Sequence, residues 1–236
     1  MTAICTNLNQ ILENIAAAAR KAGRAPETVK LVAVSKTVPV GPIQEAIDCG
    51  QVLFGENYLQ EAAEKIPQLH GASWHYIGHL QSNKCREIAA LFDTVETVDR
   101  LKVAYRLDEQ AAALNRQLKI LVQVNIGEEP QKAGVMPEET EALLAAVRNC
   151  AHLHCLGLMA LPPHFDDPEG SRPYFRQLRE IGEICAQKEL FFDNQKLELS
   201  MGMSGDYPAA IEEGATIIRV GTALFGRRPN KKEGEK

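Results

Sequence analysis

The chain has 236 residues, of which 45% are hydrophobic and 24% are charged, and its formal net charge is -5. This length fits one large α/β domain or two small ones and allows a large buried core. The negative charge argues against a general affinity for nucleic acid. No apolar run is long enough to cross a bilayer, so we do not expect a membrane protein.

The first segment, MTAICTNLNQILENIAAAARKAG, predicts an amphipathic helix rather than a signal peptide. It lacks a basic start, and its apolar residues Leu8, Ile11 and Ile15 recur at helical spacing. Because no export signal is visible, we expect a cytoplasmic protein.

The cysteines are scattered and form no CxxC pair. They are Cys5, Cys49, Cys85, Cys150, Cys155 and Cys185. In a chain without an export signal, this pattern predicts reduced, half-buried thiols. The histidines form no HExxH or zinc-ribbon spacing, so we expect no metal site.

After the first helix, short β-rich runs alternate with helical runs. The predicted strands are 31–36, 52–55, 74–78, 94–98, 120–126, 155–161, 197–201 and 216–221. The predicted helices are 42–49, 57–69, 83–92, 100–116, 137–150, 169–188 and 206–213. Asp206 stands at the start of the last of these as a candidate N-cap, followed by a proline in the first turn.

Eight strands alternating with helices predict an α/β fold, a single (β/α)₈ TIM barrel with an extra N-terminal helix. The competing architecture is an open doubly wound sheet, which normally has fewer strands, and no GxGxxG turn follows the first strand. We expect residues 1–226 to form one domain and the polar tail 227–236 to be disordered.

The first strand, in the stretch LVAVSKTVP (31–39), ends on a lysine although it is otherwise apolar. Side chains alternate across a strand, so Val32, Val34 and Lys36 share one face. A buried lysine favours its neutral amine, which is a nucleophile toward carbonyls. Lys36 is therefore a candidate Schiff-base lysine. The alternative is a lysine that reaches water and pairs with a carboxylate such as Glu56.

The last strand, TIIRVG, also carries a cation inside an apolar pattern. Arg219 shares a face with Ile217 and Gly221, and a buried guanidinium needs a carboxylate, a phosphate or a ring nitrogen as acceptor. A structural ion pair with Glu198 or another barrel carboxylate is the alternative.

Small-residue turns follow the last two strands, SMGMSGD (200–206) and VGTALFG (220–226). In TIM barrels the corresponding loops often bind phosphate through backbone N–H groups. Asp206 would repel a phosphate unless it faces away as a helix cap. A ligand with a carbonyl for Lys36, a phosphate for these loops and a planar group for Arg219 is pyridoxal 5′-phosphate.

The chain resembles the YggS/PROSC family of pyridoxal-phosphate homeostasis proteins from about Ile11 to Gly226. The motifs that carry the resemblance are LVAVSKTVP, FGENYLQEAAEK, WHYIGHLQSNK, VNIGEEPQKAGV, GLMALPP and LSMGMSGDYPAAIEEGATIIRVGTALFG. The resemblance implies a barrel like the N-terminal domain of bacterial alanine racemase.

By this resemblance the cofactor-binding residues are Lys36, Asn57, Ser200, Met201, Ser204, Arg219, Gly221 and Thr222. Lys36 would hold the cofactor covalently as an internal aldimine, and Arg219 would meet the pyridine nitrogen. Ser204, Gly221 and Thr222 would hold the phosphate. The remaining three residues would lie near the ring.

The resemblance also implies a carrier without catalytic residues, which stores pyridoxal phosphate and passes it transiently to apo-enzymes. In alanine racemase an opposing tyrosine comes from a second domain across the dimer. This chain ends ten residues after Gly226, so we expect neither that domain nor that dimer, but a monomer. The alternative is a small pyridoxal-phosphate-dependent racemase or lyase. A phosphosugar enzyme with Lys36 as an aldolase-type lysine fits the resemblance badly.

Three further segments have two interpretations each. The segment 164–175 is either a mobile rim over the site or only a surface loop. His75, His79 and Lys84 either receive a second, weakly held cofactor molecule or belong to a strand, a turn and a solvated helix start. The cations of the tail either attract phosphate or are only solvated; they are Arg227, Arg228, Lys231 and Lys232.

Overall fold

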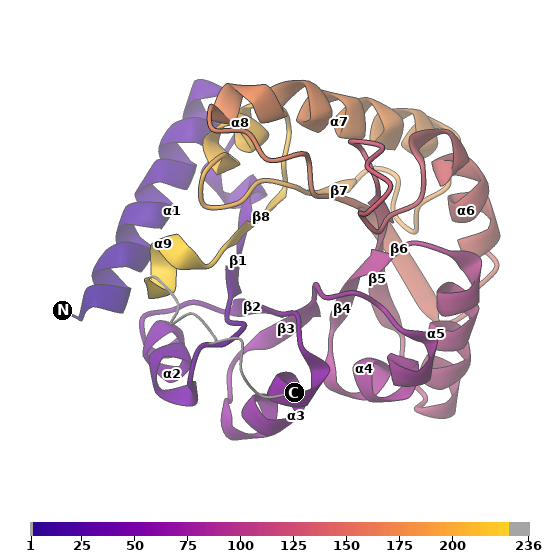
Figure 1. The fold of residues 1–236 in the computed structure, drawn as a ribbon, viewed down its shortest axis with the longest axis horizontal. Helices are drawn as coiled ribbons and strands as arrows, with labels where there is room; N and C mark the ends of the chain where they lie inside the picture. Colours follow the sequence, from indigo (N-terminus) through magenta and orange to yellow (C-terminus); the bar gives the residue numbers. More distant parts are fainter. Residues whose placement is uncertain (1, 227–236) are drawn as a thin grey trace.

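The computed structural model describes residues 2–226, and its strands form a closed, parallel eight-stranded barrel (Figure 1). The strands are β1 (Lys30–Val34), β2 (Leu53–Glu56), β3 (Ser73–Tyr76), β4 (Thr94–Val98), β5 (Leu118–Val124), β6 (Leu153–Ala160), β7 (Glu198–Ser200) and β8 (Ile217–Val220). Each strand pairs with the next, and β1 also pairs with β8, which closes the barrel. The predicted fold class is confirmed, and each predicted strand end lies within two residues of the observed one.

The helices surround the barrel. They are α1 (Ala3–Lys21), α2 (Val40–Asp48), α3 (Leu59–Lys65), α4 (Cys85–Leu91), α5 (Leu101–Ala113), α6 (Thr140–Val147), α7 (Arg172–Gln187), α8 (Tyr207–Glu212) and α9 (Thr222–Phe225). Short 3₁₀ helices precede several of them, including η5 (Pro168–Ser171) before α7. The one-turn helix α9 was not predicted.

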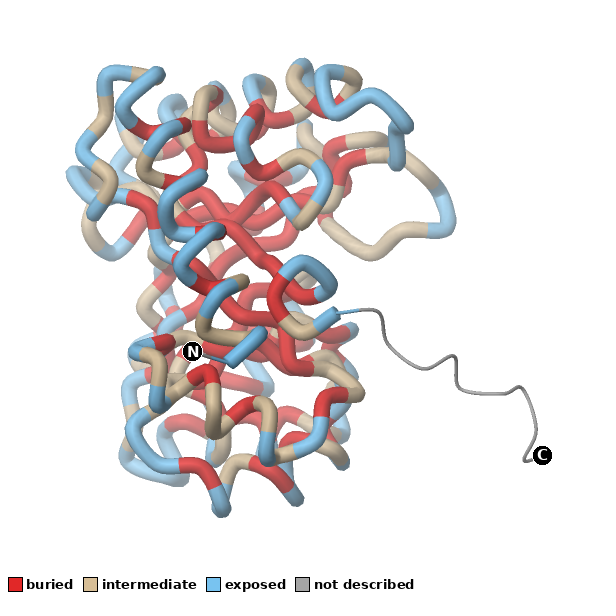
Figure 2. The backbone as a smooth tube through the Cα atoms, turned by 90° about the vertical axis from the view of Figure 1, so that its left-hand side faces the viewer, coloured by how far each residue is buried: buried red, intermediate tan, exposed pale blue. Residues whose placement is uncertain are grey.

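Strand residues alternate between two apolar clusters. Val32, Leu121, Met159 and Ile217 belong to a small cluster inside the barrel. Their strand neighbours, such as Ala33, belong to the large cluster between the strands and the helices. Figure 2 shows the buried backbone in the middle of the molecule and the exposed segments around it. The period of two seen in the sequence therefore decides which side chains enter the barrel.

Helix α1 covers the place where the last strand meets the first. Its buried side chains include Leu8, Ile11 and Ile15, and it packs beside α2, α8 and α9 (Figure 1). No helix among residues 2–226 combines the length and the apolar character needed to cross a membrane.

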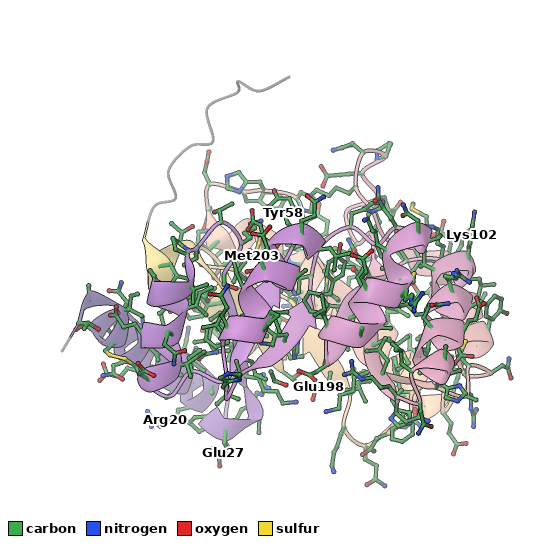
Figure 3. All side chains as sticks on the ribbon, turned by 90° about the horizontal axis from the view of Figure 1, so that it is seen from below. Arg20, Glu27, Tyr58, Lys102, Glu198 and Met203 are labelled. Carbon is green, nitrogen blue, oxygen red and sulfur yellow. A yellow bond between two sulfur atoms is a disulfide. The ribbon has the colours of Figure 1, made fainter. Side chains whose placement is uncertain are left out.

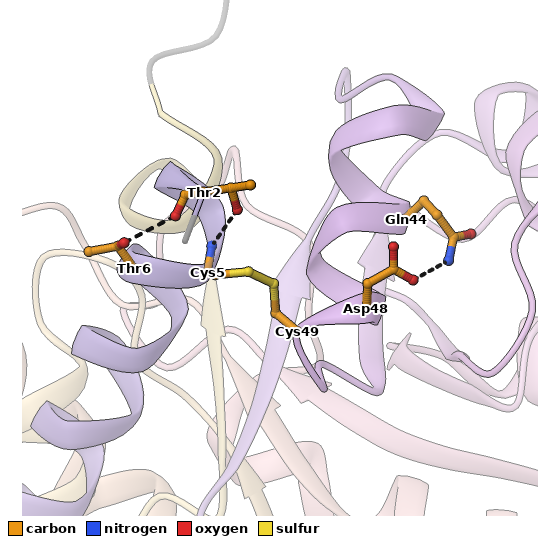
Figure 4. Close-up of a disulfide and its surroundings, with 6 residues drawn as sticks. All are labelled: Thr2, Cys5, Thr6, Gln44, Asp48 and Cys49. Carbon is orange, nitrogen blue, oxygen red and sulfur yellow. Dashed lines mark hydrogen bonds between the residues drawn. A yellow bond between two sulfur atoms is a disulfide. The ribbon is translucent and has the colours of Figure 1, made fainter.

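The expectation of six reduced, half-buried thiols was wrong. Cys5 and Cys49 form a disulfide that links the first turns of α1 to the end of α2 (Figure 4). Their Cα atoms lie 5.6 Å apart, within the range that a disulfide spans. The other four cysteines are free and fully buried. The sequence did not reveal the pair because its members, 44 residues apart, meet only when α1 packs beside α2.

Candidate functional site

A cavity of about 700 Å³ opens at the C-terminal ends of the strands. It is lined by Val34, Lys36, Asn57, Ile77, Lys132, Met159, Leu161, Pro162, Pro163, His164, Phe165, Asp166, Pro168, Ser171, Met203, Ser204, Gly205, Asp206, Arg219, Gly221 and Thr222. Figure 3 shows Tyr58 and Met203, which follow β2 and β7, at one end of the barrel, whereas Glu198, which begins β7, lies toward the other. Enzymes with this fold have their active sites at the same end.

Six of the eight expected cofactor-binding residues line this cavity: Lys36, Asn57, Ser204, Arg219, Gly221 and Thr222. Ser200 and Met201 do not line it. Ser200 is fully buried inside the barrel and contacts Arg219, whereas Met201 belongs to the outer apolar cluster. Consecutive residues at the end of a strand point in opposite directions, so these two cannot both face the cavity.

Lys36 lies two residues beyond β1 and lines the cavity together with Val34. Glu56, the carboxylate considered as its partner, is fully buried and accepts hydrogen bonds from Lys65 Nζ at 3.0 Å and from Ser35 Oγ at 2.8 Å. Because Glu56 shares a strand face with Phe54 of the outer cluster, it lies between β2 and α3.

Arg219 lies at the floor of the cavity in a buried hydrogen-bond network. Its Nη1 donates to Ser200 Oγ at 2.5 Å, and Ser200 Oγ donates to Glu96 Oε2 at 2.6 Å. The other Glu96 oxygen is 2.6 Å from His75 Nδ1. Arg219 Nη2 donates to the carbonyl oxygen of Ala160 at 2.9 Å. The network fixes the guanidinium of Arg219 in one orientation.

Burial and neighbouring charges shift two pKa values in this network. Burial lowers the pKa of the Arg219 guanidinium, against the opposing charges of Glu96 and Asp206. Burial alone would raise the pKa of Glu96, but the hydrogen bonds and charge of His75, with the charge of Arg219, hold that pKa below its ordinary value. A carboxylate and a guanidinium therefore compensate each other beneath the cavity.

The ion-pair partner of Arg219 is Glu96, not Glu198, which was the carboxylate named from the sequence. Glu198 lies at the opposite end of the barrel, where it accepts hydrogen bonds from Thr216 Oγ1 at 2.6 Å and from Lys30. Sequence reasoning missed Glu96 because the motif TVETV gave no sign of which face the carboxylate takes.

The turns after β7 and β8 bring backbone N–H groups to the cavity wall. Within residues 2–226, the N–H groups of Ser204, Gly205 and Thr222 donate to no protein acceptor. Asp206 occupies the N-cap position of α8, but its carboxylate does not cap that helix. Instead, Oδ1 accepts from the N–H of Met203 at 2.7 Å. The donors at this wall could bind an anion.

Asn57 adds an unpartnered acceptor. Asn57 lines the cavity, and its buried Oδ1 has no hydrogen-bond partner in the described part of the chain. Buried polar atoms normally have a partner, so such an atom at a cavity indicates a ligand group. The cavity therefore combines the Lys36 amine, the Asn57 amide, the Arg219 guanidinium and the N–H groups of two turns. This set of groups fits a phosphorylated aromatic aldehyde.

The segment 164–175 contributes to the rim of the cavity. His164, Phe165, Asp166 and Pro168 all line it, and Phe165 stacks on Tyr174 with ring centroids 5.7 Å apart. On the same side lies Lys132, a lining residue that sequence reasoning missed. Its Nζ donates to the carbonyl oxygen of Pro162 at 3.0 Å.

The other sequence candidates do not join the cavity. His75 is buried in the Glu96 network, so it does not lie on a positive edge with His79 and Lys84. The basic tail lies outside the described residues. Among residues 2–226, no three His, Cys, Asp or Glu side chains are arranged to hold a metal ion.

The site combines a parallel barrel, a lysine after the first strand and an arginine on the last strand. These features place the chain among barrel proteins of the alanine racemase N-terminal type. Residues 6–229 match the family model described as the N-terminal domain of alanine racemase.

Curated relatives narrow this class. The chain is 44% identical to the "Pyridoxal phosphate homeostasis protein" of Haemophilus influenzae over 94% of each chain, and 43% identical to that of Escherichia coli K12 over 99% of this chain and 100% of the relative. The solved structure of PipY from Synechococcus elongatus with pyridoxal phosphate bound is 37% identical, with a TM-score of 0.81 over 94% of this chain and 100% of the other. The chain belongs to the family of the pyridoxal phosphate homeostasis proteins, as the motifs indicated.

Proposed function

We propose that this chain binds pyridoxal 5′-phosphate as a Schiff base on Lys36 and serves vitamin B6 homeostasis as a carrier without catalysis of its own. The observation that carries the proposal is the convergence of Lys36, Arg219 and Asn57 with unpaired N–H groups on one cavity. The names of the curated relatives and the cofactor bound to PipY support the same ligand.

Each lining group has a role in this proposal. The N–H groups of Ser204 and Thr222, with Gly221 beside them, hold the phosphate. Asn57 Oδ1 accepts a hydrogen bond from the ligand. Arg219 donates to the pyridine nitrogen. Bound pyridoxal phosphate would supply an electrophilic aldehyde, with which the Lys36 amine would condense to a C=N bond with release of one water.

A carrier role follows from the surroundings of Arg219. A guanidinium cannot readily release a proton, and the Glu96 carboxylate beside it stabilises its charge, so the pyridine nitrogen accepts a hydrogen bond and stays unprotonated. An unprotonated ring withdraws electrons poorly, which disfavours carbanion chemistry. Within the described chain no tyrosine lines the cavity to serve as a second acid–base group.

The oligomeric state, the location and the partners of the protein remain predictions. We expect a monomer in the cytoplasm that contacts apo-enzymes only transiently while it delivers the cofactor. A pyridoxal-phosphate-dependent racemase or lyase is the alternative function. It requires steady turnover of an amino acid, which a panel of amino acids tested for racemisation, transamination and decarboxylation would detect.

The proposal is tested by the visible absorption of the purified protein with pyridoxal phosphate, followed by borohydride reduction and peptide mapping. We expect a yellow band and a fixed adduct on Lys36 in the wild type, and neither in Lys36→Ala. Lys30→Ala is the matched control, because Lys30 lies at the other end of the same strand and pairs with Glu198. A wild-type protein that is colourless and carries no adduct after unbound pyridoxal phosphate has been removed would refute the proposal.

A further inference from the structure

The two residues that flank Lys36 are both held by side chains of α3. The carbonyl oxygen of Ser35 accepts a hydrogen bond from Lys65 Nζ at 3.1 Å. The N–H of Thr37 donates to Glu61 Oε2 at 2.8 Å. Lys65 Nζ and Glu61 Oε2 are 3.2 Å apart, so one ion pair across a single turn of α3 holds the chain on both sides of Lys36.

A fully buried carboxylate completes this arrangement. Glu56 Oε1 accepts from Lys65 Nζ and from the hydroxyl of Ser35, as described above. Burial raises the pKa of Glu56, against the charge of Lys65. We call Ser35, Glu56, Glu61 and Lys65 the Lys65 cluster. Such a cluster contributes little net stability, but it specifies geometry where its hydrogen bonds are made.

The backbone directly after Lys36 is strained. Thr37 has φ +61°, a left-handed conformation that is rare for a β-branched residue, and its Oγ1 is buried without a partner in the described chain. Strain of this kind persists only where surrounding contacts impose it, and it is concentrated at functional sites. The hydrogen bond from Thr37 to Glu61 is such a contact.

We propose that Glu61 and Lys65 are positioning residues that fix the backbone around Lys36 and so direct its amine to the cofactor. The inference rests on the proposed function and adds to it, because neither residue lines the cavity. They act from the outer side of the barrel through peptide groups, and the cofactor need not touch them. A fixed backbone lowers the entropy lost when the amine bonds to the cofactor.

The test compares Glu61→Ala, Glu61→Gln and the wild type, with Glu64→Ala as matched control. Glu64 lies on the same helix, carries the same charge and is exposed. We expect Glu61→Ala to lower the apparent affinity for pyridoxal phosphate about tenfold, because a hydrogen bond to a charged group is lost. Glu61→Gln, which keeps an oxygen acceptor for Thr37, should restore most of the affinity. Glu64→Ala should match the wild type.

Two further measurements separate positioning from stability. Urea unfolding shows what fraction of each variant is folded, and amide hydrogen exchange of the cofactor-free protein should be faster at Thr37 in Glu61→Ala than in Glu64→Ala. Lys65→Met should lower the affinity in the same way. Lys65→Met leaves the buried Glu56 without its cationic partner. If this variant does not fold, the result for Glu61→Ala alone decides whether the positioning role is correct.

The outcomes distinguish this inference from the proposed function. If the wild type forms the Lys36 adduct and folded Glu61→Ala forms it with equal affinity and equal exchange at Thr37, the positioning role is refuted and the carrier proposal stands. If the wild type forms no adduct, both the positioning role and the proposed carrier function are refuted. An equal loss of affinity in Glu61→Ala and Glu61→Gln would refute positioning through the hydrogen bond to Thr37, because glutamine keeps the oxygen acceptor and loses only the charge.

Discussion

Arg219 and Glu96 form an ion pair inside the barrel, with Nη1 and Oε2 3.8 Å apart and the hydroxyl of Ser200 hydrogen-bonded to both. Both side chains are almost completely buried. Burial removes most of the solvent contact of both charges, so each is stabilised by the other. The orientation of the guanidinium at the cavity floor therefore depends on a carboxylate that does not line the cavity.

Replacing Glu96 with alanine should lower the free energy of unfolding by about 3–5 kcal/mol, because it leaves the Arg219 charge buried and unpaired. Urea unfolding measures this loss. Glu87→Ala is the control. The side chain of Glu87 is 55% exposed and lies 3.7 Å from Lys84, so its removal should change stability by no more than about 0.5 kcal/mol. Equal effects of the two substitutions would contradict the role given to Glu96.

The contributions of Glu96 and Glu56 to the free energy of unfolding should change with pH in opposite directions. The folded-state pKa of Glu96 is lowered, so its contribution to stability is present above the ordinary value of 4.5 and is lost as the pH falls through the folded pKa. The folded-state pKa of Glu56 is raised, so its contribution is present below 4.5 and is lost as the pH rises through the folded pKa.

Urea unfolding of Glu96→Gln and Glu56→Gln across the acid range checks these signs. The stability deficit of Glu96→Gln relative to the wild type should shrink as the pH falls. Glu56→Gln should become more stable relative to the wild type as the pH rises. Parallel curves for both variants and the wild type would show that neither carboxylate has a shifted pKa.

Reduction of the protein should expose two thiols to alkylation and leave four protected. Cys5 and Cys49 are half-buried in their disulfide, so reduction should leave both thiols within reach of the reagent, whereas the other cysteines are buried. Burial also raises the pKa of Cys85 to about 11 and that of Cys155 to about 12, so little thiolate forms at mild pH. Intact-mass spectrometry after iodoacetamide counts the adducts: none before reduction, two after reduction, and six after reduction and unfolding.

Loss of the same disulfide should also lower stability. It closes a loop of 44 residues, for which loop entropy gives an upper bound of about 4 kcal/mol. Urea unfolding of Cys49→Ser measures the loss. The variant should keep its affinity for pyridoxal phosphate, because the disulfide joins α1 to α2 and neither cysteine lines the cavity.

Gly78→Ala should weaken cofactor binding through Asn57. A Cβ atom at Gly78 would lie 2.0 Å from the carbonyl oxygen of Asn57, so the backbone that carries the orphaned amide must move. We expect a loss of about 1–3 kcal/mol in stability, typical of overpacking, together with weaker binding. Titration with pyridoxal phosphate measures the second effect. Gly41→Ala is the control, since a Cβ there meets nothing within 4 Å.

The barrel could be predicted because the patterns that indicate it, alternating side chains in each strand and alternating strands and helices, are local in the sequence. Alternation put Val32 and Lys36 on one strand face and Arg219 on one face with Ile217. The structure shows that these faces point into the barrel and that its closure brings Lys36 and Arg219 to one end. The same reasoning missed Glu96, which meets Ser200 across 104 residues of sequence. The resemblance, not alternation, suggested Met201 near the ring, whereas alternation directs that side chain to the outer cluster once Ser200 faces inward.

What the sequence could not supply was contact between distant elements. The disulfide between Cys5 and Cys49 depends on how α1 packs beside α2. The hydrogen bonds of Lys65 depend on the rotation of α3 against the first two strands. The periodicity of the sequence does not predict how a helix is rotated against the strands, because that rotation results from the packing of the whole outer layer.

The rim of the cavity has a kinetic consequence. Pro162, Pro163 and Pro168 fix three φ angles within one short segment, and Lys132 holds the carbonyl oxygen of the first. A segment stiffened in this way is poorly suited to opening and closing over a ligand. We therefore expect cofactor release to be paced by cleavage of the bond to Lys36, so that added amines accelerate it and solvent viscosity leaves it unchanged.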